Sequence, residues 1–239
     1  MQMPEILNRY STNFSFEFFP PKTPEGSKRL FANIEELSSL EPCYVSVTYG
    51  AGGTTRGLTY ELLQRIRRET SIPVVSHLTC VGASRDEIRA LLQNYWDNGI
   101  RNILALRGDP PQGETDFTPP ADGFNYASEL VAFVRKHFPE MGIGIAGFPE
   151  GHPQTPNRLK EIEYLKAKVD AGADYIGTQL FFDNRDFYDF CERCEHAGID
   201  VPIIAGIMPI TSKKGMGKMA DLAAGSRFPA PLLKAIDRA

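Results

Sequence analysis

Glu17 is the residue of this sequence whose position points most directly to chemistry. It stands in residues 14–19, FSFEFF, where strand alternation puts Ser15, Glu17 and Phe19 on one side and three phenylalanines on the other. A carboxyl group in such apolar surroundings is desolvated, which raises its pKa and suits it to act as a general acid. The alternative is a structural carboxylate that pairs with a buried Arg or Lys.

A second carboxylate, Asp109, follows the short apolar run at residues 103–106 in the sequence NILALRGDPP. A buried strand that ends in charges and a turn is typical of the carboxyl edge of an α/β sheet, where ligands bind. The alternative is an ordinary turn aspartate after an ordinary strand.

Polar side chains stand inside or just after most of the predicted strands. In chain order they are Glu17, Thr48, His77, Asp109, Glu150 (after Phe148) and Gln179. In a βα barrel these positions converge on one mouth, so the pattern predicts one shared site.

Four cationic or titratable residues could line this mouth, namely His77, Arg107, His152 and Lys168. Together they would give an otherwise acidic chain a local positive rim, which suits a phosphate-bearing cofactor. Each of them, taken alone, is equally well explained as a satisfied surface group.

The elements that must position these side chains alternate seven times between strand and helix. Apolar runs predict strands at residues 14–19, 44–49, 74–80, 103–106, 143–148, 175–182 and 201–209. Helical spacing and caps predict helices at residues 23–40, 58–69, 84–99, 126–138, 158–171 and 186–197, with two short ones at 212–224 and 231–238. Ser84 and Glu87 have the spacing of a capping box.

The strands are continuous apolar runs, as in a parallel sheet covered by helices. No linker or change of composition divides the chain. We therefore expect one domain over residues 1–239, an α/β fold of the TIM (β/α)8-barrel type. A doubly wound open sheet is the alternative. The eighth βα unit of such a barrel is missing from the sequence.

Composition narrows the function further. The chain has 239 residues and a formal net charge of -4, which gives no support to nucleic-acid binding. No apolar run approaches the roughly 20 residues of a membrane span, and residues 1–13 do not resemble a signal peptide. Four scattered cysteines are too few for a disulfide framework, so we expect a protein of the reducing cytoplasm.

Several other sites are not expected. His137 and His196 lie on predicted helices and no pair of histidines has the spacing of metal ligands, so we expect no metal. Cys191 and Cys194 have C-x-x-C spacing, but they lie on a predicted helix without the context of a thioredoxin motif. The sequence GIGIAG at residues 142–147 fits a dinucleotide fingerprint, but it lies within a predicted strand and no helix opens after it. No lysine falls at the end of a predicted strand, which argues against an aldolase that forms a Schiff base.

The segments FEFFPPKT, YVSVTYGAGG, HLTC, NGIRNILALRGDPP, KVDAGAD, TQLFFD and AGIDVPIIAGIMPI resemble, in this order, methylenetetrahydrofolate reductase of the bacterial type. The resemblance implies a TIM barrel that holds FAD and takes electrons from NADH or NADPH. The implied reaction is reduction of 5,10-methylenetetrahydrofolate to 5-methyltetrahydrofolate, by ping-pong kinetics, for methionine biosynthesis. The implied partners are folate and a nicotinamide dinucleotide, and members tend to form homo-oligomers.

The resemblance also implies residue roles. Glu17 would protonate N10 of the folate and help to open its five-membered ring, and Asp109 would bind the pterin beside the flavin. Thr48 and Gln179 would contact substrate or nicotinamide. The implied flavin-binding positions are Tyr49, Ala51, His77, Arg107, Gly108, Asp109, Tyr126, Ala127, Phe148, His152, Glu161 and Lys168.

The chain departs from the family pattern in places. Phe148 stands where some members have Tyr, and Glu161, Tyr164 and Ala167 replace an Asp, an Asn and an Arg, which weakens the implied phosphate or adenine contacts. The last family strand, with its His-Phe-Tyr-Thr-Leu-Asn type of motif, does not follow. A folate- or flavin-binding fragment or subunit without turnover is therefore the alternative function.

Overall fold

The structure is a computed structural model that describes residues 1–9, 11–49, 56–109, 119–223 and 225–238. The chain divides into two compact units, Met1–Gly144 and Ile145–Ala239, each described by itself below. The prediction of a single domain is not tested by this division. In the described parts of the chain, no helix is both long enough and apolar enough to cross a lipid bilayer.

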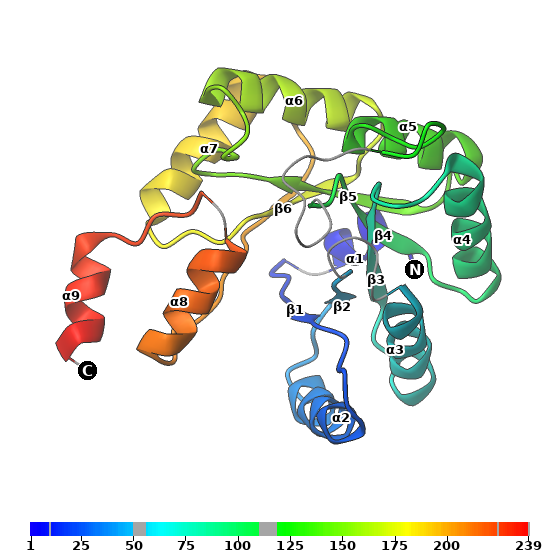
Figure 1. Ribbon diagram of the computed structural model, residues 1–239, viewed down its shortest axis with the longest axis horizontal. Helices are drawn as coiled ribbons and strands as arrows, with labels where there is room; N and C mark the ends of the chain where they lie inside the picture. The colour runs from blue at the N-terminus through cyan, green and yellow to red at the C-terminus, as the bar shows by residue number, and fades with distance from the viewer. Residues whose placement is uncertain (10, 50–55, 110–118, 224, 239) are drawn as a thin grey trace. The chain divides into compact units, whose positions relative to one another are not determined.

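The first unit alternates helices and strands (Figure 1). Its elements are α1 (Met3–Arg9), β1 (Ser15–Phe18), α2 (Pro24–Ser38), β2 (Tyr44–Val47), α3 (Arg56–Glu69), β3 (Val74–Thr79), α4 (Arg85–Asp97), β4 (Asn102–Leu106), α5 (Ala127–His137) and the first half of β5 (Gly142–Gly147). The strands β1 to β4 pair in chain order, and each pair is parallel. The capping box at Ser84 and Glu87 forms as predicted.

The second unit continues the alternation from the second half of β5. It contains α6 (Arg158–Asp170), β6 (Tyr175–Thr178), α7 (Asn184–His196), β7 (Ile203–Ile204), α8 (Lys213–Leu222) and α9 (Ala230–Arg238). The strands β6 and β7 are parallel. An ion pair of 2.7 Å between Lys213 and Asp237 joins α8 to α9.

The strand order β1 to β7 follows the chain, and helices alternate with the strands throughout. This connectivity is that of a TIM (β/α)8 barrel, so the predicted fold class is confirmed. A doubly wound sheet would reverse its strand order at a switch point, and no reversal occurs. The described residues contain seven strands and no eighth.

Two predicted strands are shorter in the structure by four residues or more. The strand predicted at residues 201–209 is reduced to Ile203–Ile204, and the one at 175–182 ends at Thr178. The reason is a close approach: the backbone N–H of Gly206 donates to the Thr178 hydroxyl at 2.9 Å, and a Cβ on Gly206 would lie 2.2 Å from the Thr178 carbonyl oxygen. The side-chain bond replaces the backbone ladder at this point.

Side chains of β3 alternate between the face covered by helices and the opposite face of the sheet. Ser76 Oγ donates to the hydroxyl of Tyr95 on α4 at 3.1 Å, so Ser76 faces the helix layer. Because alternate strand residues point to opposite faces, His77 and Thr79 share the other face. This is the face on which the sequence places the functional site.

The helix α1 was not predicted from the sequence. Met3 and Ile6 of α1 are buried, at 0% and 1% exposure. The buried side chain of Asn102, on β4, accepts from Met3 N at 2.7 Å and donates to Met1 O at 3.1 Å. Asn102 therefore fastens the N-terminus to the sheet.

Replacing Asn102 by Ala should lower the free energy of unfolding by about 2–3 kcal/mol, because buried backbone groups lose their partners. Urea unfolding measures this. Asn98→Ala is the control: Asn98 is exposed and its side chain bonds only to Asn94 at the end of α4, so its effect should stay within about 0.5 kcal/mol. Equal effects of the two substitutions would contradict the role of Asn102.

Candidate functional site

The carboxylate of Glu17 lies in a cluster with one residue from each of the next two strands. The parallel register sets Ser46 opposite Glu17, and Val75 opposite Ser46, so that His77 follows two residues along β3 on the same face. His77 Nε2 is 3.2 Å from Glu17 Oε2, and Ser46 Oγ donates to the same oxygen at 3.3 Å. His77 and Ser46 are buried, whereas the Glu17 side chain is 51% exposed.

The pKa of Glu17 is lowered, opposite to the direction expected from the sequence. Burial raises the pKa, as expected, but the polar contact with His77, the charge of His77 and the hydrogen bond from Ser46 outweigh it. The sequence segment FSFEFF shows the aromatic neighbours of Glu17 and not the imidazole that reaches it from β3. The carboxylate is therefore ionised in the pair.

Two buried polar atoms at the end of β3 have no hydrogen-bond partner among the described residues. They are Nε2 of His77 and Oγ1 of Thr79. His77 Nε2 is within ion-pair distance of Glu17, but it is not aligned for a hydrogen bond. Buried polar atoms usually have partners, so these two atoms mark a place where a polar ligand fits.

The turn after β4 packs against the carboxyl end of β3. Gly108 has φ +86°, and a Cβ there would lie 2.7 Å from Val81 Cγ2 and 2.9 Å from Thr79 Cβ. Only glycine accommodates both the conformation and the contact. The turn brings Arg107 and Asp109 to this edge; Asp109 is exposed and forms no hydrogen bond or ion pair with a described residue.

The other predicted positions of the first unit are more dispersed. The hydroxyl of Tyr49, which is buried, accepts from Arg56 Nε at 2.6 Å, and burial raises the pKa of Tyr49. Thr48 follows β2 and is half-buried. Tyr126 is 62% exposed at the N-cap of α5, and Ala127 is the first residue of that helix. Ala51 lies outside the described residues.

In the second unit, Lys168 of α6 directs its amine against the end of β5. Nζ donates to the carbonyl oxygen of Ala146 at 2.7 Å. Burial lowers the pKa of Lys168 to about 8, although the charge of Glu161 acts in the opposite direction. An enclosed ammonium of this kind is a ready partner for an anionic ligand.

The loop after β5 gathers three further predicted residues. The backbone N–H of His152 donates to Glu161 Oε2 at 3.3 Å, and Glu161 is 5% exposed. The rings of Phe148 and His152 meet edge to face, with centroids 4.7 Å apart. His152 Nδ1 accepts from Gln154 N at 3.2 Å, so Nε2 is the ring nitrogen that carries a proton.

Gln179 continues the edge of β6 beside this loop. Its backbone N–H donates to Gly147 O at 2.8 Å, and its side-chain oxygen accepts from Leu180 N at 2.8 Å.

Each unit thus assembles part of the predicted set, and the site roles of these residues stay predictions. The first unit brings together Glu17, His77 and the turn at Gly108, and the second brings together Phe148, His152, Glu161 and Lys168. Sequence reasoning missed Ser46 and Thr79. The alternation in YVSVTY and VVSHLTC places them on the face of Thr48 and His77, and this signal could have found them. In the described part of the chain, no group of three or more metal-binding side chains forms.

Comparison with known sequences finds extensive similarity. The sequence profile of a family described as methylenetetrahydrofolate reductase matches residues 2–239. A 5,10-methylenetetrahydrofolate reductase of Salmonella typhimurium is 44% identical over 210 residues, which are 88% of this chain and 69% of that protein. The Escherichia coli protein of the same name is 43% identical over 225 residues, 94% of this chain and 73% of that protein.

A longer plant relative is also similar. Methylenetetrahydrofolate reductase (NADH) 1 of Arabidopsis thaliana is 41% identical over 242 residues, and the chain covers 41% of its length. Among solved structures, an uncharacterised Clostridium thermocellum protein that binds two copies of 5-methyl-5,6,7,8-tetrahydrofolic acid matches with a TM-score of 0.68 and 22% identity, over 98% of this chain and 78% of that one. At that identity the likeness shows the fold alone.

Proposed function

This chain belongs to the methylenetetrahydrofolate reductase family, and we propose that it reduces 5,10-methylenetetrahydrofolate to 5-methyltetrahydrofolate, with FAD as cofactor and a reduced nicotinamide dinucleotide as electron donor. The observation that carries the proposal is the Glu17–His77 pair near the ends of parallel strands, in which the Glu17 side chain is half exposed. In barrels of this type, the carboxyl ends of the strands are where substrates react.

The reaction consumes one proton, because opening of the imidazolidine ring leaves N10 as an amine. When His77 is protonated, the pair holds one proton that either partner can carry. Transfer from His77 to Glu17 leaves a neutral imidazole and a carboxylic acid, and the acid then protonates N10. His77 Nε2 lies 3.2 Å from Oε2, so we assign Oε2 as the oxygen that receives the proton and passes it to N10.

When bound, FAD would supply the hydride chemistry that links the nicotinamide to the methylene carbon of the folate. The chain offers features that suit it. Buried polar atoms of His77 and Thr79 have no hydrogen-bond partner among the described residues, and Gly108 packs closely against Thr79. Lys168 and His152 in the second unit carry the charge and the donor that a diphosphate needs.

The remaining roles follow from family membership. Asp109 and Thr48 would contact the folate, and Gln179 the folate or the nicotinamide. NADH is the electron donor to test first, because the name of the Arabidopsis relative includes NADH.

All four cysteines are free thiols, which supports a reducing compartment such as the cytoplasm. We also expect a homo-oligomer and a place in methionine biosynthesis.

Absorbance spectroscopy under anaerobic conditions tests the proposal in two steps. The purified chain with FAD should lose its flavin absorbance band when NADH is added, and the band should return when 5,10-methylenetetrahydrofolate follows. A band that never bleaches with NADH or NADPH would refute the reductase. Saturable folate binding together with an unbleached band would instead support the alternative of a binding protein without turnover.

A further inference from the structure

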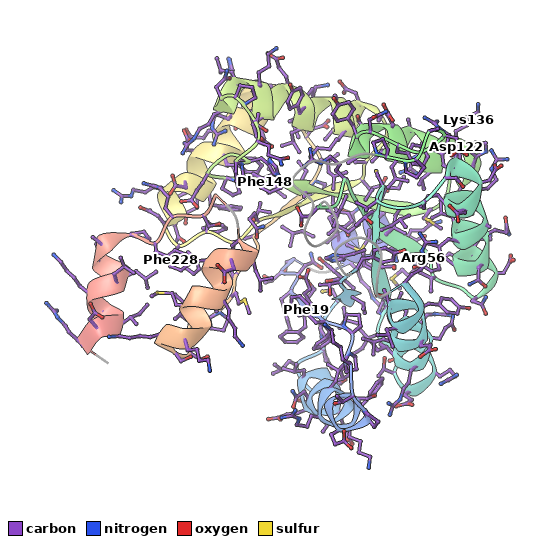
Figure 2. All side chains as sticks on the ribbon, in the orientation of Figure 1. Phe19, Arg56, Asp122, Lys136, Phe148 and Phe228 are labelled. Atoms are coloured by element: carbon purple, nitrogen blue, oxygen red, sulfur yellow. The ribbon has the colours of Figure 1, made fainter. Side chains whose placement is uncertain are left out.

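Residues 225–228, which we call the GSRF segment, connect α8 to α9 and lie against the loops that follow β5 and β6. Ser226 Oγ donates to the carbonyl oxygen of Leu180, and the ring of Phe228 stacks on Phe182 with centroids 4.6 Å apart. Gly225 has φ +91°, and a Cβ there would lie 2.9 Å from the carbonyl oxygen of Gly151. The segment is therefore fitted to these loops. Figure 2 shows Phe228 on this segment and Phe148 beyond the end of β5.

Arg227 is the centre of these contacts. Its backbone N–H donates to Glu150 Oε2 at 2.8 Å, its Nε donates to Glu150 Oε1 at 3.1 Å, and Nη2 donates to Asp186 Oδ2. The side chains of Glu150 and Asp186 are only 4% and 11% exposed. Two enclosed carboxylates thus depend on one guanidinium, and breaking such a pair leaves a charge without compensation.

The contact with Glu150 fixes the loop that carries His152. Glu150 is separated from His152 by Gly151 alone, which has φ +88°. The same loop is held at Pro149, whose carbonyl oxygen accepts from Arg193 Nη2 of α7 at 3.0 Å, and at His152 N, which donates to Glu161. Of these three contacts, only the one made by Arg227 comes from outside the helices α6 and α7.

We propose that Arg227 is a positioning residue that holds residues 149–152 in the conformation that binds FAD, so that the GSRF segment sets the affinity for the cofactor. This inference rests on the proposed function. Arg227 is not among the flavin-binding positions that the family resemblance implies. It would act on the cofactor only indirectly, through Glu150. Arg227 donates to both carboxylate oxygens of Glu150, so it orients that side chain as well as compensating its charge.

Flavin fluorescence titration of the purified chain measures the FAD dissociation constant directly, without turnover. Arg227→Ala should raise that constant by about 10- to 100-fold, the effect typical of losing an outer partner of a bound group. Arg227→Lys should recover part of the affinity, because an ammonium keeps the charge but not the forked geometry. Arg185→Ala is the control: Arg185 is 89% exposed, pairs with Asp183 close by in sequence, and should leave the constant unchanged.

Loss of Arg227 leaves both Glu150 and Asp186 enclosed and charged, so the folding of the single variant must be checked first. The triple variant Glu150→Gln, Asp186→Asn, Arg227→Ala removes both uncompensated charges while the guanidinium stays absent. Weak FAD binding by this triple variant, at a melting temperature equal to the parent's, supports positioning by Arg227. Parent-like FAD binding by that variant, or equal weakening in Arg185→Ala, overturns it. If the parent itself binds no FAD, the proposed function fails, which is a separate result.

Discussion

Glu17→Gln should abolish folate reduction while NADH still reduces the flavin. The amide cannot deliver a proton to N10, and loss of a positioned general acid costs roughly 10²–10⁴-fold in rate. Hydride donation by the nicotinamide needs no acid, so that half-reaction should change little. Gln keeps the size of Glu17 and its oxygen can still accept from Ser46, so the local structure should persist.

Stopped-flow absorbance resolves the two half-reactions of this variant. Glu25→Gln is a matched control, since Glu25 is exposed in the first turn of α2, and both of its half-reactions should equal those of the parent. If Glu17→Gln reoxidised its flavin with methylenetetrahydrofolate at the parent's rate, the assigned acid would be wrong. Equal loss of both half-reactions would point to a damaged flavin site instead.

Lys168→Met should stabilise the chain without FAD and weaken its binding of FAD. The pKa of Lys168 is lowered by burial to about 8 from an ordinary 10.5, so at neutral pH the buried amine stays protonated at a cost to folding. At about 1.4 kcal/mol per pKa unit, less the lost bond to Ala146 O, removing the amine should add about 1–3 kcal/mol to the free energy of unfolding. Losing a charge-assisted bond to a phosphate should weaken FAD binding by roughly 10- to 100-fold.

The lowered pKa of Lys168 also predicts how the free energy of unfolding changes with pH. Between pH 8 and 10.5 the unfolded chain binds more protons at Lys168 than the folded chain, so this residue makes the parent's stability rise with pH over that window. The variant should lack that rise. Urea unfolding of both proteins at several pH values measures it. Lys166→Met, on the same helix and paired with Asp170, is the control and should stay within about 0.5 kcal/mol. A destabilised Lys168→Met with unchanged FAD affinity would contradict the account.

Much of the fold could be predicted because its signals are local. The alternation of apolar runs with amphipathic segments gave the order of strands and helices, and the capping box at Ser84 fixed the start of α4. What could not be predicted depends on contacts between distant segments. The shortening of β7 comes from the Thr178 hydroxyl, and α1 is held by Asn102, far away in the sequence.

The same distinction holds for the site. Glu17 and His77 could be chosen because each stands within a strand near its end, and parallel strands bring such positions together. The direction of the Glu17 pKa could not, because it depends on whether desolvation or the imidazole dominates at a distance of 3.2 Å. The contacts of Arg227 also escaped prediction, since the segment GSRF shows no periodicity or motif that points to Glu150.

A single-turnover product analysis tests the central claim most directly. The chain with bound FAD is reduced anaerobically by NADH, freed of nicotinamide, held in D₂O and then mixed with 5,10-methylenetetrahydrofolate. We expect 5-methyltetrahydrofolate in an amount equal to the bound flavin, with one deuterium in the methyl group, because the hydrogen on the nitrogen of a reduced flavin exchanges with solvent whereas that on the nicotinamide carbon does not. Recovery of unchanged methylenetetrahydrofolate beside a flavin that stays reduced would contradict the account.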